Sequence, residues 1–289
     1  MEERVTVRVL VPGDEAALIE FLSAHLETSL MLLSNIERAG LVDRGEPFQA
    51  TYVASFDGAG AITAVAGHSW NGNVLLQGDV GLEQAALRAA EVSQRRVRGF
   101  LGAWAQVCRA RRAFGLEAAP AAHDGAELLY ALPLAELQVP ELLSRSDVAL
   151  RVPSAAEARD VLGGWRVGYH VEILGSVRTP ELEQQAQREI DGQLATGRLW
   201  VLAVGDELVA MTAFNAEARG AVQVGGVFTA PGYRGRGYAR AAVAASLQLA
   251  RARGATRSFL FTGENKRAAQ RAYTALGFRV IGDYGLVLF

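Results

Sequence analysis

An arginine- and glycine-rich stretch, Arg234-Gly235-Arg236-Gly237-Tyr238-Ala239, joins an apolar run ending at Thr229 to an alanine-rich segment. Glycine has no Cβ and adopts positive φ readily, so Gly235 and Gly237 allow the backbone to curl until several N–H groups point to one spot. Residues 239–253 carry aliphatic side chains at helical spacing, which places those N–H groups at the positive end of a helix dipole. The stretch therefore predicts a binding site for a phosphate or pyrophosphate group.

Three kinds of phosphate-binding loop have glycines at comparable spacing. A Walker loop requires a lysine and a hydroxyl residue directly after its last glycine, whereas Gly237 is followed by Tyr238 and Ala239. A dinucleotide-binding loop requires a third glycine, where this chain has Arg240, and an acidic residue about twenty residues later. The remaining pattern, Arg-x-x-Gly-x-Ala starting at Arg234, resembles the coenzyme A loop of the GNAT acyltransferase superfamily. An ordinary surface turn rich in arginine and glycine is the alternative interpretation.

A second stretch, residues 264–278, also resembles this superfamily. The residues that carry the resemblance are Asn265, Ala268, Tyr273, Gly277 and Phe278. A short apolar run at residues 258–262, suited to a buried strand, separates this stretch from the helix that follows the glycine loop. The chain is thus identified as a member of the GNAT superfamily over about residues 148–289.

Strands and helices are predicted to alternate around both motifs. Apolar runs and helical periodicity predict strand 149–152, helices 155–162 and 180–194, strands 199–204, 208–214 and 221–229, helix 239–253, strand 258–262, helix 266–276, and strands 279–281 and 284–289. The resemblance implies the GNAT acyl-CoA N-acyltransferase fold, an α/β fold whose mixed central sheet has helices on both faces.

The first half of the chain repeats this order of predicted elements. Where the second half has its arginine–glycine loop, the first half has Gly78-Asp79-Val80-Gly81-Leu82, which adds a negative charge where phosphates would bind. We therefore expect two tandem GNAT-like domains, a degenerate and non-catalytic one at residues 1–140 and a catalytic one at residues 141–289. A generic α/β accessory domain is the alternative for the first half.

The composition narrows the class of protein. Half of the 289 residues are hydrophobic and the formal net charge is −2, so the overall charge favours neither nucleic acid nor an anionic membrane as a partner. The single cysteine, Cys108, excludes an internal disulfide and a cysteine-based metal cluster, and no metal is expected. No apolar run approaches the roughly 20 residues that span a bilayer, and the acidic start lacks a signal-peptide core. These features predict a cytoplasmic protein and leave the oligomeric state open.

The resemblance implies transfer of an acetyl group from acetyl-CoA to a primary amine of a small molecule or protein, with the two reactants held in line. A main-chain N–H of the strand before the loop would polarise the thioester carbonyl, and this strand would pair with the pantetheine amides. The implied cofactor-binding residues are Val227, Phe228, Thr229, Arg234, Gly235, Arg236, Gly237, Tyr238, Ala239, Asn265 and Ala268. For Asn265, capping of the last helix is an equally good explanation.

The same resemblance assigns Tyr273 as the acid that protonates the departing thiolate, with a core tyrosine as the alternative. The base is less defined, because many relatives have a glutamate where this chain has Gln223. Glu172 is the candidate base and His170 a second one, although either residue suits a solvated helix face as well. Tyr169 and Gln223 are expected to contact the amine. A rival hypothesis is a non-catalytic acyl-CoA sensor or scaffold.

Overall fold

The computed structural model describes residues 5–289, which form two compact α/β units. Unit 1 consists of the chain up to Leu128 together with Gly282–Phe289, and unit 2 of Leu129–Ile281. The last residues of the second half are therefore part of unit 1. The division into separate domains at residues 1–140 and 141–289 stays a prediction.

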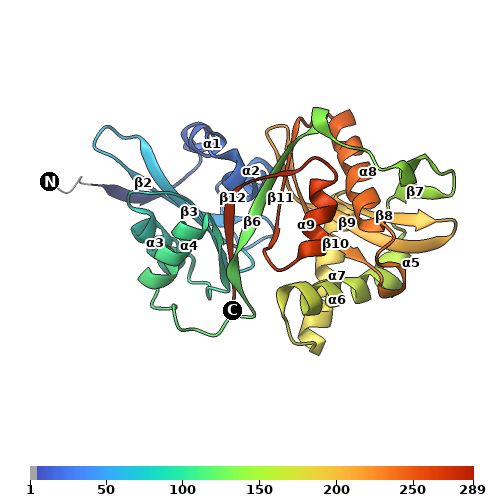
Figure 1. Cartoon of the computed structure of the whole chain (residues 1–289). Helices are drawn as coiled ribbons and strands as arrows, with labels where there is room; N and C mark the ends of the chain where they lie inside the picture. Colours follow the sequence, from blue (N-terminus) through green and yellow to red (C-terminus); the bar gives the residue numbers. More distant parts are fainter. Residues whose placement is uncertain (1–4) are drawn as a thin grey trace. The chain divides into compact units, whose positions relative to one another are not determined.

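Unit 1 is a mixed sheet with helices on both faces (Figure 1). Its strands lie in the order β1 (Thr6–Val9), β2 (Ala50–Phe56), β3 (Ile62–Ser69), β4 (Asn73–Gly78), β5 (Gly99–Gly102) and the end of β12 (Arg279–Leu288). Among the ladders described in this unit, β4 and β5 pair in parallel and the others are antiparallel. The helices are α1 (Glu15–Ser23), α2 (Leu26–Ala39), α3 (Leu82–Ser93) and α4 (Trp104–Ala113). Fully buried side chains such as Val53, Leu76, Ala86 and Phe100 form the core under α3 and α4.

Unit 2 repeats this plan. Its strands lie in the order β6 (His123–Pro133), β11 (Arg257–Gly263), β10 (Ala221–Thr229), β9 (Glu207–Ala218), β8 (Leu199–Val204) and β7 (Val148–Arg151), of which β6 belongs to this unit from Leu129 onward. The helices are α5 (Ala155–Glu157), α6 (Gly163–Leu174), α7 (Pro180–Ala195), α8 (Tyr238–Ala252) and α9 (Arg267–Thr274). Single 3-10 turns occupy Leu134–Glu136, Glu141–Ser144 and Pro231–Tyr233.

Alternation along the strands of unit 2 supplies two cores, because successive side chains point to opposite faces of a sheet. On β8, Leu199 and Val201 pack with α6 and α7, whereas Leu202 packs with α8. Tyr238 and Ala241 bring the first turns of α8 onto this second face. Helix α8 follows the arginine–glycine loop at residues 234–239, called the phosphate loop below, and these contacts hold the helix against the sheet.

Local sequence explains where two helices of unit 2 begin. Ser154 and Glu157 form a capping box at the start of α5, in which each side chain accepts a hydrogen bond from the other residue's main-chain N–H. Thr179 caps α7 and is followed by Pro180 in the first turn, where a missing N–H costs nothing.

Two sequence predictions differ from the structure. The predicted helix 155–162 continues through a π-helical turn, Ala158–Leu162, into α6, because buried packing of Leu162 and Val167 outweighs the helix-breaking tendency of Gly163-Gly164. The two predicted C-terminal strands are one strand, β12. Its end pairs with β5 from Gly285 to Leu288, and this distant pairing is invisible in the local sequence, where Gly282 and Asp283 suggest a turn.

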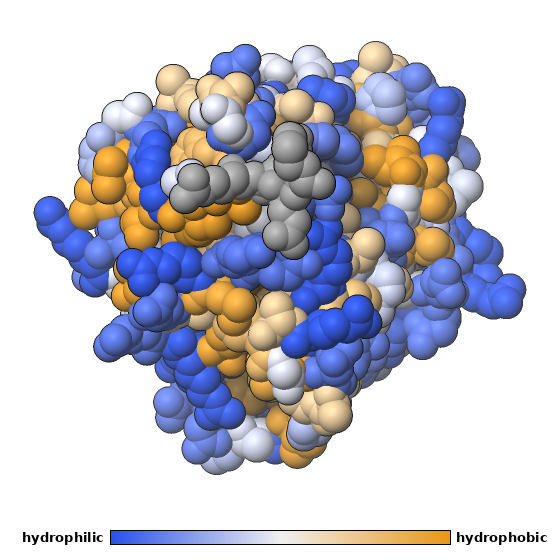
Figure 2. Space-filling model, turned by 90° about the vertical axis from the view of Figure 1, so that its left-hand side faces the viewer, coloured by the Kyte–Doolittle hydropathy of each residue, from blue (hydrophilic) through white to orange (hydrophobic). Residues whose placement is uncertain are grey.

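No helix within residues 5–289 is long and apolar enough to cross a membrane. Across the same range, no group of three or more histidine, cysteine, aspartate or glutamate side chains converges as metal ligands would. Figure 2 shows hydrophobic residues in separate groups among hydrophilic ones on the face that it draws.

Candidate functional site

Strands β10 and β11 of unit 2 diverge after a short parallel ladder. They pair only from Ala221 to Gln223 on β10 and from Arg257 to Phe259 on β11, although β10 continues to Thr229. Residues 224–229 of β10 therefore have no strand partner on that side within the described chain. An unpaired strand edge can form main-chain hydrogen bonds with an extended ligand, as in β-augmentation.

A β-bulge shapes the free edge of β10. Between the pairs Gly225–Ala213 and Phe228–Met211, two residues of β10 face a single residue of β9. Gly226 in this bulge has φ +60°, which favours glycine. The predicted cofactor-binding residues Val227, Phe228 and Thr229 thus form the bulge and the end of the free edge.

The phosphate loop begins just after this strand, and its backbone has the predicted form. Gly235 has φ +77°, and Gly237 has φ +82° at the N-cap of α8. The first intrahelical bond runs from the Ala241 N–H to the Gly237 carbonyl, so the amides that precede Ala241 have no acceptor within the helix. A Cβ on Gly235 would meet no atom within 4 Å. The glycines keep these donors open to an anion.

Three arginines surround this loop. The Arg234 Nε donates to the Thr229 carbonyl at 3.0 Å, and the Arg236 guanidinium lies 5.9 Å from the Tyr233 ring centre. The Nε of Arg240 is buried and has no hydrogen-bond partner among the described residues. A buried unpaired donor is costly, so a pyrophosphate at the loop would satisfy both the amides and a nearby cation.

Tyr273 lies on α9 in an aromatic environment. Its ring centre is 6.4 Å from that of Tyr130 and 6.1 Å from that of Phe278. Burial, with smaller contributions from Tyr169 and Tyr130, raises the pKa of the Tyr273 phenol above its usual value. The phenol therefore stays protonated at neutral pH, which an acid requires. The role of Tyr273 as the acid stays a prediction.

The predicted capping role of Asn265 is wrong. Helix α9 begins at Arg267 with Lys266 at the N-cap, and no side-chain cap is formed. The Lys266 N–H bonds instead to the Gly263 carbonyl, so a main-chain turn starts the helix. Ala268 lies in the first turn of α9, and contact of either Asn265 or Ala268 with a cofactor stays a prediction.

The predicted acceptor-side residues lie on α6 and β10. Glu172 is 41% exposed on its side chain and forms an ion pair with Arg234 at 2.8 Å. His170 is buried, and its Nε2 lies 2.9 Å from a Glu189 carboxylate oxygen, so the alternative of a solvated helix residue is wrong for His170. Gln223 is 1% exposed at the last ladder pair before the strands diverge, and its Oε1 is buried without a partner in the described part of the chain.

Sequence reasoning missed a polar cluster behind the bulge. Arg166 is 4% exposed and its Nη2 donates to Gln193 Oε1, while its Nε lies 3.8 Å from the Glu189 carboxylate that also contacts His170. Desolvation opposes ionisation of Glu189, but the nearby His170 and Arg166 outweigh it and lower the Glu189 pKa. The i, i+4 spacing of Arg166 and His170 on one helix face is the sequence signal for this cluster.

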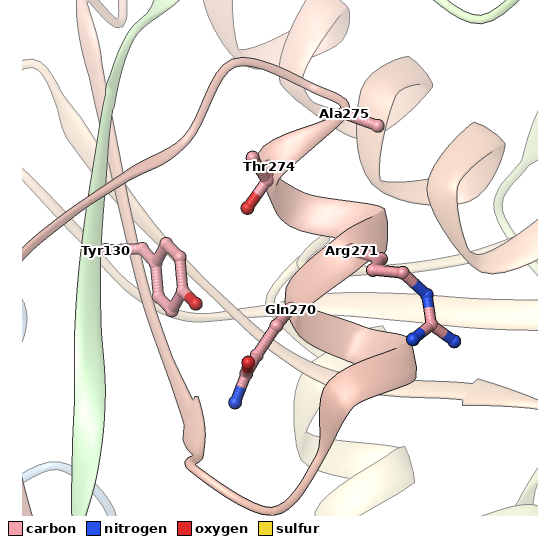
Figure 3. A pocket seen from close by; sticks show the side chains of 5 residues that line it. All are labelled: Tyr130, Gln270, Arg271, Thr274 and Ala275. Carbon is pink, nitrogen blue, oxygen red and sulfur yellow. The ribbon is translucent and has the colours of Figure 1, made fainter.

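A hollow of about 530 Å³ lies beside α9 and is lined by Tyr130 of β6 and by residues of the helix (Figure 3). Thr274 and Tyr130 point toward one another, whereas the Arg271 guanidinium projects from another side of α9. None of the predicted cofactor or acceptor residues lines this hollow. The ring of Tyr130, which lines it, lies 6.4 Å from the ring of Tyr273.

In unit 1, the corresponding place differs in packing and charge. A Cβ on Gly102 would lie 2.8 Å from the Leu76 carbonyl, so β4 and β5 stay in contact just beyond their ladder. Ahead of α3, Arg109 binds both carboxylate oxygens of Glu83 and forms an ion pair with Asp79. Two carboxylates paired with Arg109 therefore lie ahead of α3, where unit 2 has the arginines of its loop.

Comparisons with known proteins agree with this geometry. Residues 169–278 match the model of the acetyltransferase (GNAT) family. A search of curated proteins found no match. The chain resembles a GCN5-related N-acetyltransferase from Sphaerobacter thermophilus, with a TM-score of 0.56 and 16% identity over 99% of this chain and 96% of that one.

Two further solved structures cover essentially the whole chain. A tandem GNAT protein from the clavulanic acid biosynthesis pathway has a TM-score of 0.53 and 14% identity, covering 98% of this chain and 97% of its own. A GCN5-related glucosamine N-acetyltransferase region of a fungal multi-domain β-N-acetylglucosaminidase has a TM-score of 0.55 and 15% identity. This chain is covered completely but spans only 38% of the fungal protein. Residues 169–278 therefore carry the acetyltransferase domain of the GNAT family, and the chain as a whole has the fold of tandem GNAT proteins.

Proposed function

We propose that the protein is an acetyl-CoA-dependent N-acetyltransferase that transfers the acetyl group directly to a primary amine of a small molecule or protein. The observation that supports this most is the free edge of β10, which runs directly into the phosphate loop. A thioester with a pantetheine arm and a pyrophosphate needs both features in this order. Acetyl-CoA supplies the activated acetyl group.

The residues that would hold acetyl-CoA fit its parts. Main-chain groups of Val227, Phe228 and Thr229 suit the amides of the pantetheine arm. The amides of residues 235–239, with the cations of Arg236 and Arg240 nearby, suit the pyrophosphate. Tyr238 packs its ring into the sheet and anchors the loop. A main-chain N–H at the bulge would polarise the thioester carbonyl.

In the transfer step, the amine nitrogen forms a bond to the acetyl carbon as the carbon–sulfur bond breaks. Tyr273 gives its phenolic proton to the departing thiolate and recovers a proton from solvent afterwards. Its raised pKa keeps this proton available at neutral pH. The amine must lose a proton in turn, and Glu172 is the candidate acceptor, directly or through a water.

Glu172 has a second assignment, because its carboxylate already binds Arg234. Its main-chain carbonyl accepts a hydrogen bond from Lys266 Nζ at 3.1 Å. The residue thus links α6 to the phosphate loop and to the start of α9. We propose that this linking role positions the loop, and that the amine proton can leave through water held near Gln223.

Two measurements on the full chain test the proposed function. Calorimetry should detect acetyl-CoA binding, and a thiol-release assay with a panel of amines should detect free CoA. Failure of well-folded protein to bind acetyl-CoA would contradict the proposal. Binding without thiol release for any amine or protein acceptor would favour the sensor or scaffold hypothesis instead.

A further inference from the structure

The buried guanidinium of Arg166 lies directly against the bulge of β10. A Cβ on Gly226 would be 2.7 Å from its Nη2 and 2.8 Å from its Nη1, so the guanidinium occupies space that only a glycine at this position leaves. The bulge lies within the free strand edge at which acetyl transfer is proposed. Arg166 is therefore placed beside the reacting groups, on the side from which α6 and α7 cover the strand.

Most donors of this guanidinium lack a protein partner. Arginine carries five N–H donors, and among the described residues only Nη2 makes a hydrogen bond, to Gln193 Oε1. The Nε is buried without a partner. The nearest carboxylate, that of Glu189, is 3.8 Å from Nε and is closer to His170, at 2.9 Å. Unpaired donors on a buried cation are unfavourable unless a ligand satisfies them.

The surroundings favour a small organic anion. Aromatic side chains add apolar surface near the Arg166 guanidinium. The ring centre of Tyr169 is 5.4 Å from it. Trp165 and Phe228 form a tilted ring pair with centres 6.2 Å apart. A guanidinium fork matches the two oxygens of a carboxylate or a phosphate. Glu189 already places one negative charge in the cluster, so a carboxylate monoanion is repelled less than a phosphate dianion.

We infer that Arg166 binds a carboxylate of the acetyl acceptor, which makes the acceptor an amino acid or a similar small amine that carries a carboxylate. This inference rests on the proposed N-acetyltransferase function. The carboxylate pairs with the free donors of Arg166, and the amine is thereby held at the bulge, next to the thioester carbon. No group is transferred by Arg166 itself.

Matched acceptors test the inference on the unaltered protein. The probes are the common amino acids and their carboxamides, which differ only in the carboxylate, assayed by thiol release from acetyl-CoA. We expect at least one amino acid to exceed its carboxamide about 10- to 100-fold in kcat/KM, the effect of losing one charge-assisted hydrogen bond. Carboxamides that equal or exceed every acid would overturn the inference.

A substitution provides an independent readout. Arg166→Gln should raise KM for the acid by about 10- to 100-fold and leave the carboxamide nearly unchanged, so that the variant no longer distinguishes the pair. The control is Arg188→Gln, an exposed arginine on α7, which should retain the preference. If Arg166→Gln does not fold, the paired acceptors on the unaltered protein still decide the question.

The outcomes of these assays distinguish failure of the proposed carboxylate site from failure of the proposed acetyltransferase function. Thiol release with neutral amines or protein acceptors, but with no amino acid, would overturn the carboxylate site while leaving the acetyltransferase intact. Acetyl-CoA binding without turnover of any amino acid would also overturn it. Absence of acetyl-CoA binding would instead remove the proposed function itself.

Discussion

The Arg234 guanidinium lies 2.8 Å from the Glu172 carboxylate, which ties the phosphate loop of unit 2 to the end of α6. Both side chains are more than 40% exposed, at 45% and 41%. An exposed ion pair of this kind contributes only about 0–1 kcal/mol, so an incoming pyrophosphate can compete for the arginine. The ion pair therefore positions the loop, but it is weak enough to break when a ligand binds Arg234.

Substitution of Glu172 distinguishes its two proposed roles, positioning of the phosphate loop and acceptance of the amine proton. Because the ion pair positions Arg234, Glu172→Gln should raise KM for acetyl-CoA about 2- to 5-fold, the loss of an interaction worth under 1 kcal/mol, and change kcat little. Steady-state kinetics at several salt concentrations measures this. A fall of 100-fold or more in kcat at unchanged KM would instead make Glu172 the base.

Gly237→Val should abolish acetyl-CoA binding. Valine at φ +82° is strained, and its side chain would cover the open amides of the loop. Gly197→Val is the matched control, since Gly197 has φ +67° in a turn after α7 and a Cβ there meets nothing within 4 Å. We expect comparable destabilisation of about 1–3 kcal/mol in both variants, and loss of binding by calorimetry only in Gly237→Val. Retained affinity would remove the loop from the cofactor site.

Tyr273→Phe should lower kcat about 100-fold with little change in acetyl-CoA affinity. It removes the proton donor but keeps the ring that packs with Tyr130 and Phe278. The neighbouring substitution Tyr130→Phe serves as the control and should leave kcat within about 2-fold. Since the pKa of the Tyr273 phenol is raised, activity of the unaltered protein should not decline through its ionisation below about pH 10. Full turnover by the phenylalanine variant would exclude the acid role.

The capping box at α5 predicts a pH-dependent stability. Hydrogen bonds from Arg151 and from the Ser154 N–H lower the pKa of Glu157 from its ordinary 4.5 to about 2. Its stabilisation is therefore complete above pH 4.5 and disappears as the pH falls toward 2. Glu157→Ala should lower the free energy of unfolding by about 1 kcal/mol at pH 7 and by much less near pH 2. Urea titrations at both pH values measure this, with the exposed Glu20→Ala as the control, and an equal loss at both would contradict it.

Acetyl-CoA should bind with a stoichiometry of one per chain. In unit 1, Asp79 and Glu83 place negative charge ahead of α3 and engage Arg109, so no second site is expected. Arg109→Met should destabilise unit 1 by about 1 kcal/mol, because it removes two solvent-accessible ion pairs, without changing the acetyl-CoA Kd. Calorimetry that yields two sites would contradict the degenerate nature of the first half.

Local chemistry in the sequence determined the loop and most elements of the fold. Gly235 and Gly237 permit the positive φ that the loop adopts, and apolar runs predict β8 and β10 at their observed bounds. These features depend on neighbours within a few residues, so a single sequence contains them.

Contacts between residues far apart in the chain determined the remaining features of the fold and the candidate site. The continuation of the α5 helix across Gly163-Gly164, the return of β12 to pair with β5, and the divergence of β10 from β11 all depend on residues far apart in the chain. The same holds for the partners of the charged groups: Glu172 meets Arg234, and Arg166 fills the space at Gly226, only because α6 crosses β10. Residue types and spacing show which groups are available, but pairing of charges and opening of a strand edge are set by the tertiary fold.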